Sequence, residues 1–480
     1  MKQKFSLFSF IILVAISWLQ AQDAPACFFN SEANRCEINV SSTEEFQNLA
    51  NIQSSCMNLC QGAPFYVTLT EDLIFSEDIL DSNCTANFSP IETFRGTFDG
   101  NNHTISGLCL KDTIPLEATL YPAIFNNVNQ ASFKNLTLKN IVSYSESGGN
   151  TAVLINYLND GLEVENIKIQ DVTLISKYYA TAALLVAEGF SEDPSSSQIF
   201  KSIQAQNINF LISGEGTIGG FVGSIYNDLK NVQFTESSLD LHVTQIDSEN
   251  EKPTSLTFGG FIAQSGKTIF EKDTLNIEFT LLNSKLPMEN ITIGGLAGVV
   301  SNRISINQVQ ADGFIKSIGE TTPDNFAGML QLGGFVGLVE TNDSIKVQNS
   351  EIKTDILLNQ LVSGQVYLGS VFGNANSPSM IIHDVVYSGD ISVESLLGDI
   401  YSIGGFVGSY NSTFENYVSS SSTANFKNLE MSGNLTYSFG EGFYPSYDNS
   451  VGGVFGTCQL SDSYPFDLIF DEIKVNGSIS

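Results

Sequence analysis

The chain has 480 residues, with 52 Asp or Glu against 21 Lys or Arg and a formal net charge of −31. Binding to nucleic acid or anionic lipid needs clustered basic side chains that displace counterions from phosphates, and only Arg35, Arg95 and Arg303 represent arginine. The composition therefore argues against a nucleic-acid partner. The scattered acids are typical of a solvated, repulsive surface on an extended β protein.

The N-terminus has the three parts of a secretory signal peptide. Lys2 and Lys4 precede an apolar run from Phe5 to Trp18, and the small residue Ala21 suits the last position before cleavage. The apolar run is shorter than the roughly 18–20 residues of a spanning helix. We therefore expect residues 1–21 to be removed, the mature chain to be secreted or held at the cell surface, and no membrane insertion after cleavage.

Most of the cysteines lie near the mature N-terminus. In an exported chain such a cluster predicts up to three disulfides, and six cysteines allow fifteen pairings. The candidates are Cys27, Cys36, Cys56, Cys60, Cys84 and Cys109. A metal site is the alternative for Cys56-x-x-x-Cys60, although this motif lacks a second close pair or a nearby His. Cys458 stands alone, so we expect a small buried residue there or an intermolecular bridge.

Asn-x-Ser/Thr sequons mark candidate glycosylation sites, which we expect on exposed turns and outer strand faces. They begin at Asn39, Asn83, Asn87, Asn102, Asn135, Asn290, Asn342, Asn411, Asn434 and Asn476.

The segment from Phe98 to Ile105, FDGNNHTI, predicts a strand, a tight turn and a second strand. Its Asp99-Gly100 pair has the chemistry of a turn with positive φ. The expected core contacts around it are Phe94, Phe98, Ile105 and Leu108.

One short pattern of paired glycines followed by apolar residues, such as GGFVG, returns along the rest of the chain at intervals of 35 to 48 residues. Its clear copies begin at Gly219, Gly259, Gly294, Gly333, Gly369, Gly404 and Gly452. Weaker copies, with small residues replacing the glycines, begin at Pro122, Thr151 and Ala182. A period in this range indicates a repeat architecture.

Each copy is followed by two runs of alternating apolar and polar residues, as in Leu229–Phe234 and Leu239–Val243. A period of two in runs rich in Val, Ile, Leu, Phe and Thr predicts strands with one buried face. The sequence therefore predicts an all-β chain with three short strands per repeat. We expect a right-handed parallel β-helix of about ten or eleven coils over residues 91–480, behind a Cys-rich cap at residues 22–90.

Stacked coils would place equivalent side chains above one another. The expected repeat core is Phe221, Phe261, Leu296, Phe335 and Phe406. The paired glycines fit either a sharp turn or a close approach of the neighbouring backbone. The chain stops within a strand-like run, so we expect either self-association through that C-terminal edge or a longer parent protein.

The segment from Ile91 to Leu108, IETFRGTFDGNNHTISGL, resembles the opening of extracellular β-helix proteins of the GLUG-repeat type. The GG-F/L-x-G repeats resemble the motif that names that family, and the likeness runs from about residue 38 to the end. The resemblance implies an extracellular β-helix. The motif occurs in surface adhesins and in the non-catalytic part of IgA-specific metallopeptidases, so it implies function only loosely.

Catalytic motifs are sparse. The chain has three His residues and neither H-E-x-x-H nor G-x-S-x-G. A polysaccharide lyase or hydrolase needs two carboxylates, and pairs such as Asp384 and Asp390 around His383 could serve. Calcium loops of the D-x-D-x-D-G or G-G-x-G-x-D type are absent from the sequence, so we expect no cofactor, with structural calcium as the alternative.

We therefore expect a non-catalytic adhesion or recognition scaffold for an extracellular glycan or protein ligand. Two alternatives remain, namely the polysaccharide-cleaving enzyme and the spacer or substrate-recognition part of a larger secreted enzyme.

Overall fold

The computed structural model describes most of the chain after residue 26. The described ranges are 27–60, 62–77, 84–112, 121–146, 148–177, 180–190, 196–213, 215–226, 231–246, 255–282, 288–318, 326–359, 365–396, 400–412, 422–439, 450–459, 466–476 and 478–479. The expected signal peptide at residues 1–21 and the sequon at Asn83 lie outside them. No helix in these ranges is both long and apolar enough to cross a membrane.

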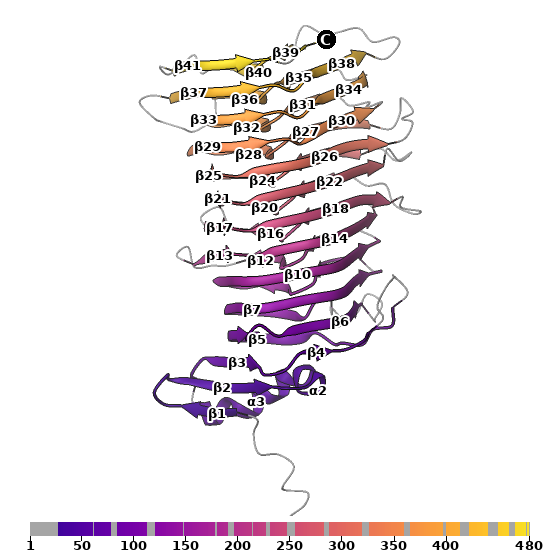
Figure 1. Cartoon of the computed structure of the whole chain (residues 1–480), viewed down its shortest axis with the longest axis vertical. Helices are drawn as coiled ribbons and strands as arrows, with labels where there is room; N and C mark the ends of the chain where they lie inside the picture. The colour runs from indigo at the N-terminus through magenta and orange to yellow at the C-terminus, as the bar shows by residue number, and fades with distance from the viewer. Residues whose placement is uncertain are drawn as a thin grey trace, which may run out of the picture.

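The described chain is an all-β protein in which strands stack along one long axis (Figure 1). The N-terminal end holds β1 (Cys27–Asn30), β2 (Arg35–Val40), α2 (Thr43–Gln47), α3 (Leu49–Cys60), β3 (Phe65–Leu69) and β4 (Leu73–Ile74). Next come β5 (Ile91–Asp99), β6 (Thr104–Lys111) and β7 (Phe125–Ser145). β1 and β2 form an antiparallel pair, and every other strand pairing in the described ranges is parallel.

From β7 onward the strands fall into four columns, in which each strand pairs with its counterpart about one repeat later. Column 1 is a separate sheet of β8 (Thr151–Ala152), β11 (Ala180–Ala183), β15 (Gly216–Gly219), β19 (Ser255–Gly259), β23 (Met288–Gly294), β27 (Phe326–Gly333), β31 (Gln365–Gly369), β35 (Ile400–Gly404) and β39 (Ser450–Gly452). Column 2 contains β9 (Ile155–Leu158), β12 (Val186–Phe190), β16 (Val222–Tyr226), β20 (Ile262–Ser265), β24 (Ala297–Val300), β28 (Val336–Glu340), β32 (Phe372–Asn376), β36 (Val407–Asn411) and β40 (Phe455–Gln459).

Columns 3 and 4 complete each repeat. Column 3 contains β13 (Ser197–Lys201), β17 (Asn231–Thr235), β21 (Lys267–Glu271) and β25 (Ile304–Asn307). Column 4 contains β14 (Gln204–Ser213), β18 (Ser238–Ile246), β22 (Thr274–Leu282), β26 (Gln310–Ile318), β30 (Asp355–Asn359), β34 (Ile391–Leu396) and β38 (Leu435–Phe439). Longer strands run through column 3 and round its corner, namely β10 (Leu162–Ser176), β29 (Ser344–Ile352), β33 (Ser379–Tyr387), β37 (Ser422–Met431) and β41 (Phe466–Val475).

The prediction of three strands per repeat is wrong, because the glycine motif does not lie inside one strand. Gly219 ends β15 and Val222 begins β16, so the motif forms the bend between columns 1 and 2. The alternating runs account for columns 3 and 4, and the residues just before the motif form the fourth strand.

The bend also corrects the phase of two weaker copies. Ala182 pairs with Ile218, and Ala183 follows it at the position of Gly219. Thr151 in turn pairs with Ala182. These copies therefore begin one residue later than the sequence suggested, at Ala152 and Ala183, where alanine is the small residue that the bend needs.

Close backbone approach explains the paired glycines. None of those in the clear copies has positive φ. A Cβ at Gly220 would collide with the carbonyl oxygen of Gly260, and a Cβ at Gly260 would collide with that of Gly295. At these two glycines successive coils come too close for a Cβ, whereas Ser370 occupies the equivalent position in the copy that begins at Gly369.

Alternate side chains of the strands in each column point into the interior and form the core. The expected repeat-core residues are all fully buried, namely Phe221, Phe261, Leu296, Phe335 and Phe406. The Phe221 and Phe261 rings lie 5.0 Å apart. A second ring stack lies in column 3, where Phe234 is 4.9 Å from Phe200 and 5.4 Å from Phe270.

The corner between columns 3 and 4 has the same backbone conformation in every coil. At this corner, one residue of each coil from β7 to β41 has a φ between 50° and 59°, in the left-handed region. These corner residues are Asn135, Asn166, Ser202, Glu236, Lys272, Gln308, Asn349, Asp384, Asn428 and Glu472. Asn and Asp tolerate this conformation best, and they fill half of the positions.

The turn after β5 differs from the expectation. Positive φ falls on Asn101 (50°) and Asn102 (67°), and not on Asp99 or Gly100. Asp99 instead accepts a hydrogen bond from the Asn101 N–H at 2.9 Å, which is the capping role that Asp takes at such turns. The nearby residues expected in the core, Phe94, Phe98, Ile105 and Leu108, are buried.

Candidate functional site

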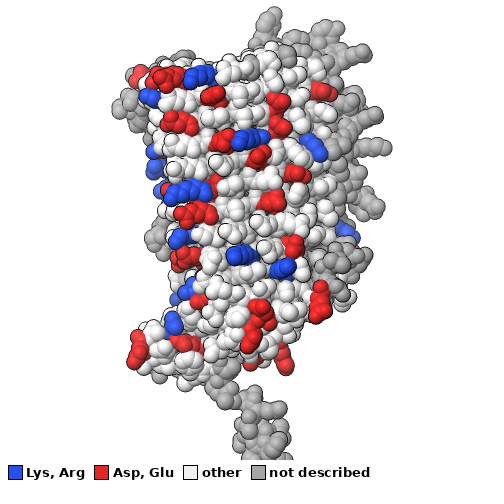
Figure 2. Space-filling view, in the orientation of Figure 1, with Lys and Arg blue, Asp and Glu red and all other residues white. Residues whose placement is uncertain are grey.

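A row of polar side chains runs along the outer face of column 3, one from each coil. Parallel pairing puts these residues directly above one another: Asp99, Lys134, Glu165, Lys201, Thr235, Glu271, Asn307, Gln348, His383, Lys427 and Asp471. We call this row the polar ladder. Figure 2 shows charged side chains of both signs alternating along this edge of the molecule.

Opposite charges in adjacent coils pair at both ends of the polar ladder. Lys134 lies 3.4 Å from Asp99, Lys201 lies 2.8 Å from Glu165, and Lys427 lies 3.2 Å from Asp471. In the middle, Thr235, Asn307 and Gln348 carry no charge, and the Glu271 carboxylate lies between Thr235 and Asn307. The ladder therefore pairs opposite charges at its ends and offers amide and hydroxyl groups, together with one carboxylate, in between.

The carboxylate of Asp99, the first residue of the polar ladder, is fixed by several hydrogen bonds. Its carboxylate accepts hydrogen bonds from the Tyr66 hydroxyl at 2.7 Å and from the Asn135 amide at 3.1 Å. Burial by itself would raise the pKa of Asp99, but these bonds, the Asn101 N–H and the Lys134 ammonium hold that pKa below its ordinary value. Asp99 is thus an ionised anchor for the first coil.

The candidate catalytic carboxylates belong to this repeating pattern. His383 is a ladder residue and Asp384 is its corner neighbour. Asp384 accepts a hydrogen bond from the Asn428 side chain at 2.7 Å, and Asp390 accepts one from the Asn434 N–H at 2.7 Å. Each carboxylate therefore links its own coil to the next one.

The cysteines form three disulfides near the N-terminus. They join Cys27 to Cys56, Cys36 to Cys60, and Cys84 to Cys109. The sulfur atoms of Cys27, Cys36 and Cys60 lie within 4.8 Å of one another, a proximity that the sequence spacing did not reveal. All three take part in disulfides, and these two bonds explain why the sulfur atoms lie so close together. Cys458 is free and half-buried.

The described sequons divide by exposure. Asn39, Asn102, Asn290, Asn342, Asn434 and Asn476 are exposed, whereas Asn87, Asn135 and Asn411 are half-buried. The Asn87 amide donates to the Gly107 carbonyl at 2.8 Å, and the Asn135 amide donates to Asp99. A glycan at either of these two nitrogens would replace a bond that holds the first coils together.

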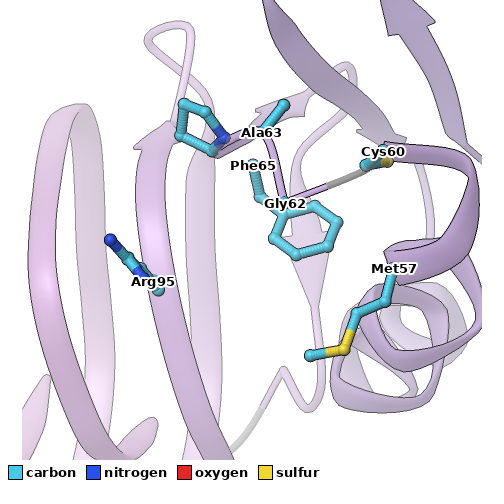
Figure 3. Close-up of a pocket in the computed structure, with 7 residues that line it drawn as sticks. Met57, Cys60, Gly62, Ala63, Phe65 and Arg95 are labelled. Carbon is cyan, nitrogen blue, oxygen red and sulfur yellow. The ribbon is translucent and has the colours of Figure 1, made fainter.

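A pocket of about 490 Å³ lies between α3 and the strands β3 and β5. Its lining residues are Met57, Cys60, Gly62, Ala63, Pro64, Phe65 and Arg95. Figure 3 shows the Phe65 ring between Met57 and Arg95, with the Arg95 guanidinium at one side. The pocket thus combines apolar walls with one cation, which sequence patterns did not reveal because its residues come from three separate elements.

Asp273 is a second group that the sequence gave no reason to select. It is 1% exposed and lies just inside the corner of its coil. Its two carboxylate oxygens accept the N–H groups of Ser237 at 2.8 Å and Glu271 at 3.0 Å. Burial nevertheless raises the pKa of Asp273 to about 7.

Comparison with known proteins adds little. No protein-family model and no curated protein matches the chain. One similar solved structure is that of a candidate immunoglobulin A1 protease from Bacteroides ovatus, at 14% identity over 90% of this chain and 84% of that one, with a TM-score of 0.27. That score is too low to support an argument about fold or function, and the GLUG resemblance stays a prediction.

Proposed function

We propose that the chain is a secreted or cell-surface recognition scaffold, folded as a right-handed parallel β-helix, that binds an extracellular glycan without cleaving it. The polar ladder carries this proposal. It offers one polar side chain per coil at a fixed spacing, on strands that are hydrogen-bonded on both sides. Such a rigid row suits a linear polymer whose hydroxyl groups also repeat.

The β-helix is supported by the pairing pattern. Each strand from β9 to β37 pairs in parallel with its counterpart about one repeat later, in every one of the four columns. The expected division into a signal peptide at 1–21, a cap at 22–90 and a repeat region at 91–480 is part of the same proposal. The three disulfides support export, because such bonds persist in oxidising compartments.

Charge narrows the ligand class. A chain with a net charge of −31 repels sulfated or uronic-acid polymers, so a neutral glycan is the better candidate. The uncharged pair of neighbouring ladder residues, Asn307 and Gln348, is the expected contact. Both side chains are half-buried, and the Asn307 amide oxygen accepts a hydrogen bond from Asn349 at 3.0 Å.

Binding of the mature chain to an array of neutral and anionic glycans tests this function, with a product assay on every glycan that binds. We expect neutral glycans to bind uncleaved, and the double variant Asn307→Ala/Gln348→Ala to weaken binding about tenfold or more. The matched control is Asn374→Ala/Ser409→Ala, because these half-buried residues pair in column 2. Cleavage of a bound glycan, or equal losses in the two double variants, would contradict the proposal.

A further inference from the structure

The pocket between α3 and β5 has a chemistry of its own, separate from the polar ladder. Met57 is 62% exposed at its rim, and Phe65, Ala63 and Pro64 supply further apolar surface. A volume of about 490 Å³ falls in the range of small-ligand sites, which are mostly apolar with a few fixed polar groups.

Arg95 is the polar group of this pocket, and the neighbouring coils hold it in place. Its guanidinium donates to the Gln130 amide oxygen at 3.1 Å, and the Gln130 amide nitrogen donates to the Asp160 carboxylate at 2.7 Å. The chain of contacts from Asp160 through Gln130 to Arg95 crosses three successive coils. It fixes the position of the guanidinium without neutralising its charge at close range.

In the described part of the chain, Arg35 has a carboxylate partner, and Arg95 and Arg303 have none within ion-pair distance. Arg35 lies 2.9 Å from the Glu37 carboxylate, whereas no carboxylate in the described part of the chain lies within ion-pair distance of Arg95. A guanidinium recognises carboxylates with paired N–H donors. The pocket therefore offers an unpaired carboxylate receptor beside an apolar wall.

We propose that this pocket binds a small monocarboxylic acid with an apolar body, the carboxylate on Arg95 and the body against Met57 and Phe65. A ligand makes both interactions only if it carries a carboxylate for Arg95 at one end and an apolar body for Met57 and Phe65 at the other. A neutral ester of the same body would lose the first interaction, and a short acid such as acetate would lose the second.

Isothermal titration of the mature chain with decanoate, below its micelle concentration, tests this site. We expect saturable binding of one decanoate, no measurable binding of acetate, and at least about tenfold weaker binding of methyl decanoate. Arg95→Gln should weaken decanoate binding by a similar factor. Arg303→Gln, which changes an arginine that does not line the pocket, should leave it unchanged.

A second pair of variants tests the apolar wall on one helix. Met57→Glu should abolish decanoate binding, because it puts a negative charge where the apolar body lies. Leu59→Glu is the control, since Leu59 is 45% exposed on α3 and does not line the pocket. Equal effects of the two arginine variants, equal effects of the two helix variants, or equal binding of acid and ester would overturn the proposal. Unchanged thermal midpoints in all four variants would show that each chain is folded.

Discussion

Asp273 carries a carboxyl group inside the stack, at a position that most coils fill with an apolar residue. The corresponding residues of the neighbouring coils are Ile203, Ser237, Val309 and Ser350. Ser237 accepts the Ile203 N–H at 3.4 Å, and Ser350 accepts the Val309 N–H at 3.2 Å. Asp273 makes the same type of bond to the Ser237 N–H, so its structural role is to accept a backbone donor at the corner.

The ionisation of Asp273 should make stability depend on pH. Folding raises its pKa from the ordinary 3.8 to about 7, so as the pH rises the unfolded chain loses this proton before the folded chain does. The contribution of Asp273 to the unfolding free energy is fully present below about pH 4. It falls by roughly 4 kcal/mol as the pH rises to about 7. Asp273→Asn should flatten this part of the pH profile, as measured by urea unfolding at several pH values.

Asp312→Asn is the control for that measurement, because Asp312 is an exposed carboxylate in the next coil. Asp312→Asn should not change the dependence of the unfolding free energy on pH between pH 4 and pH 7, compared with the parent chain. Equal pH dependence of the unfolding free energy in the parent chain and in Asp273→Asn over this interval would contradict the raised pKa.

Some individual residues were predictable from the sequence and others were not. Alternation correctly placed Phe98 and Ile105 in the core, because a period of two is a property of the strand itself. Asp273 and Arg95 escaped detection because their roles arise from contacts with residues that lie a whole repeat or more away in the chain. Local patterns contain no information about such contacts.

At the scale of the strand, the glycine motif is a bend that also fixes the distance between coils. The recurrence of the motif in the sequence identified it as a repeat, but did not show that it lies between two strands. The reason is that GGFVG is apolar on both sides of the bend, so its periodicity does not show where one strand ends and the next begins. The same ambiguity produced the one-residue phase error at Thr151 and Ala182.

The close approach at this bend gives a direct test. Gly260→Ala should destabilise the chain by about 2 kcal/mol or more, because the added methyl group collides with the Gly295 carbonyl oxygen. Gly453→Ala changes the same glycine of the motif in the last described coil, where the nearest atom to a Cβ is a Val475 methyl carbon at 3.5 Å. It should change the unfolding free energy by less than about 0.5 kcal/mol. Equal losses in the two variants would contradict backbone contact as the cause.

At the scale of the whole molecule, the two ends of the described stack differ (Figure 1). β1, α2 and α3 lie over the N-terminal end, where Phe46 and Leu49 are fully buried. At the other end, Phe470 of β41 is 48% exposed, whereas its counterpart Phe426 in the preceding coil is fully buried. Within the described ranges no strand pairs with the outer edge of β41, and hydrophobic side chains on such an edge favour pairing with a further strand.

We therefore propose that this edge supports self-association, and sedimentation velocity over a range of concentrations is the measurement. Phe470→Lys should shift the chain toward monomer at each concentration. Phe190→Lys is the control, because Phe190 is 54% exposed on β12, in the middle of the stack. A chain that is monomeric throughout, or that responds equally to both variants, would contradict the proposal.

The repeating corner has a consequence for how such a molecule can change in length. Glu236 and Lys272 have the same left-handed conformation in successive coils, and each is followed by a residue that turns into column 4. Deleting residues 237–272 would join Glu236 to Asp273 with the corner preserved. Gene duplication or loss of such a unit would thus lengthen or shorten the protein by one whole coil, without a new turn having to evolve.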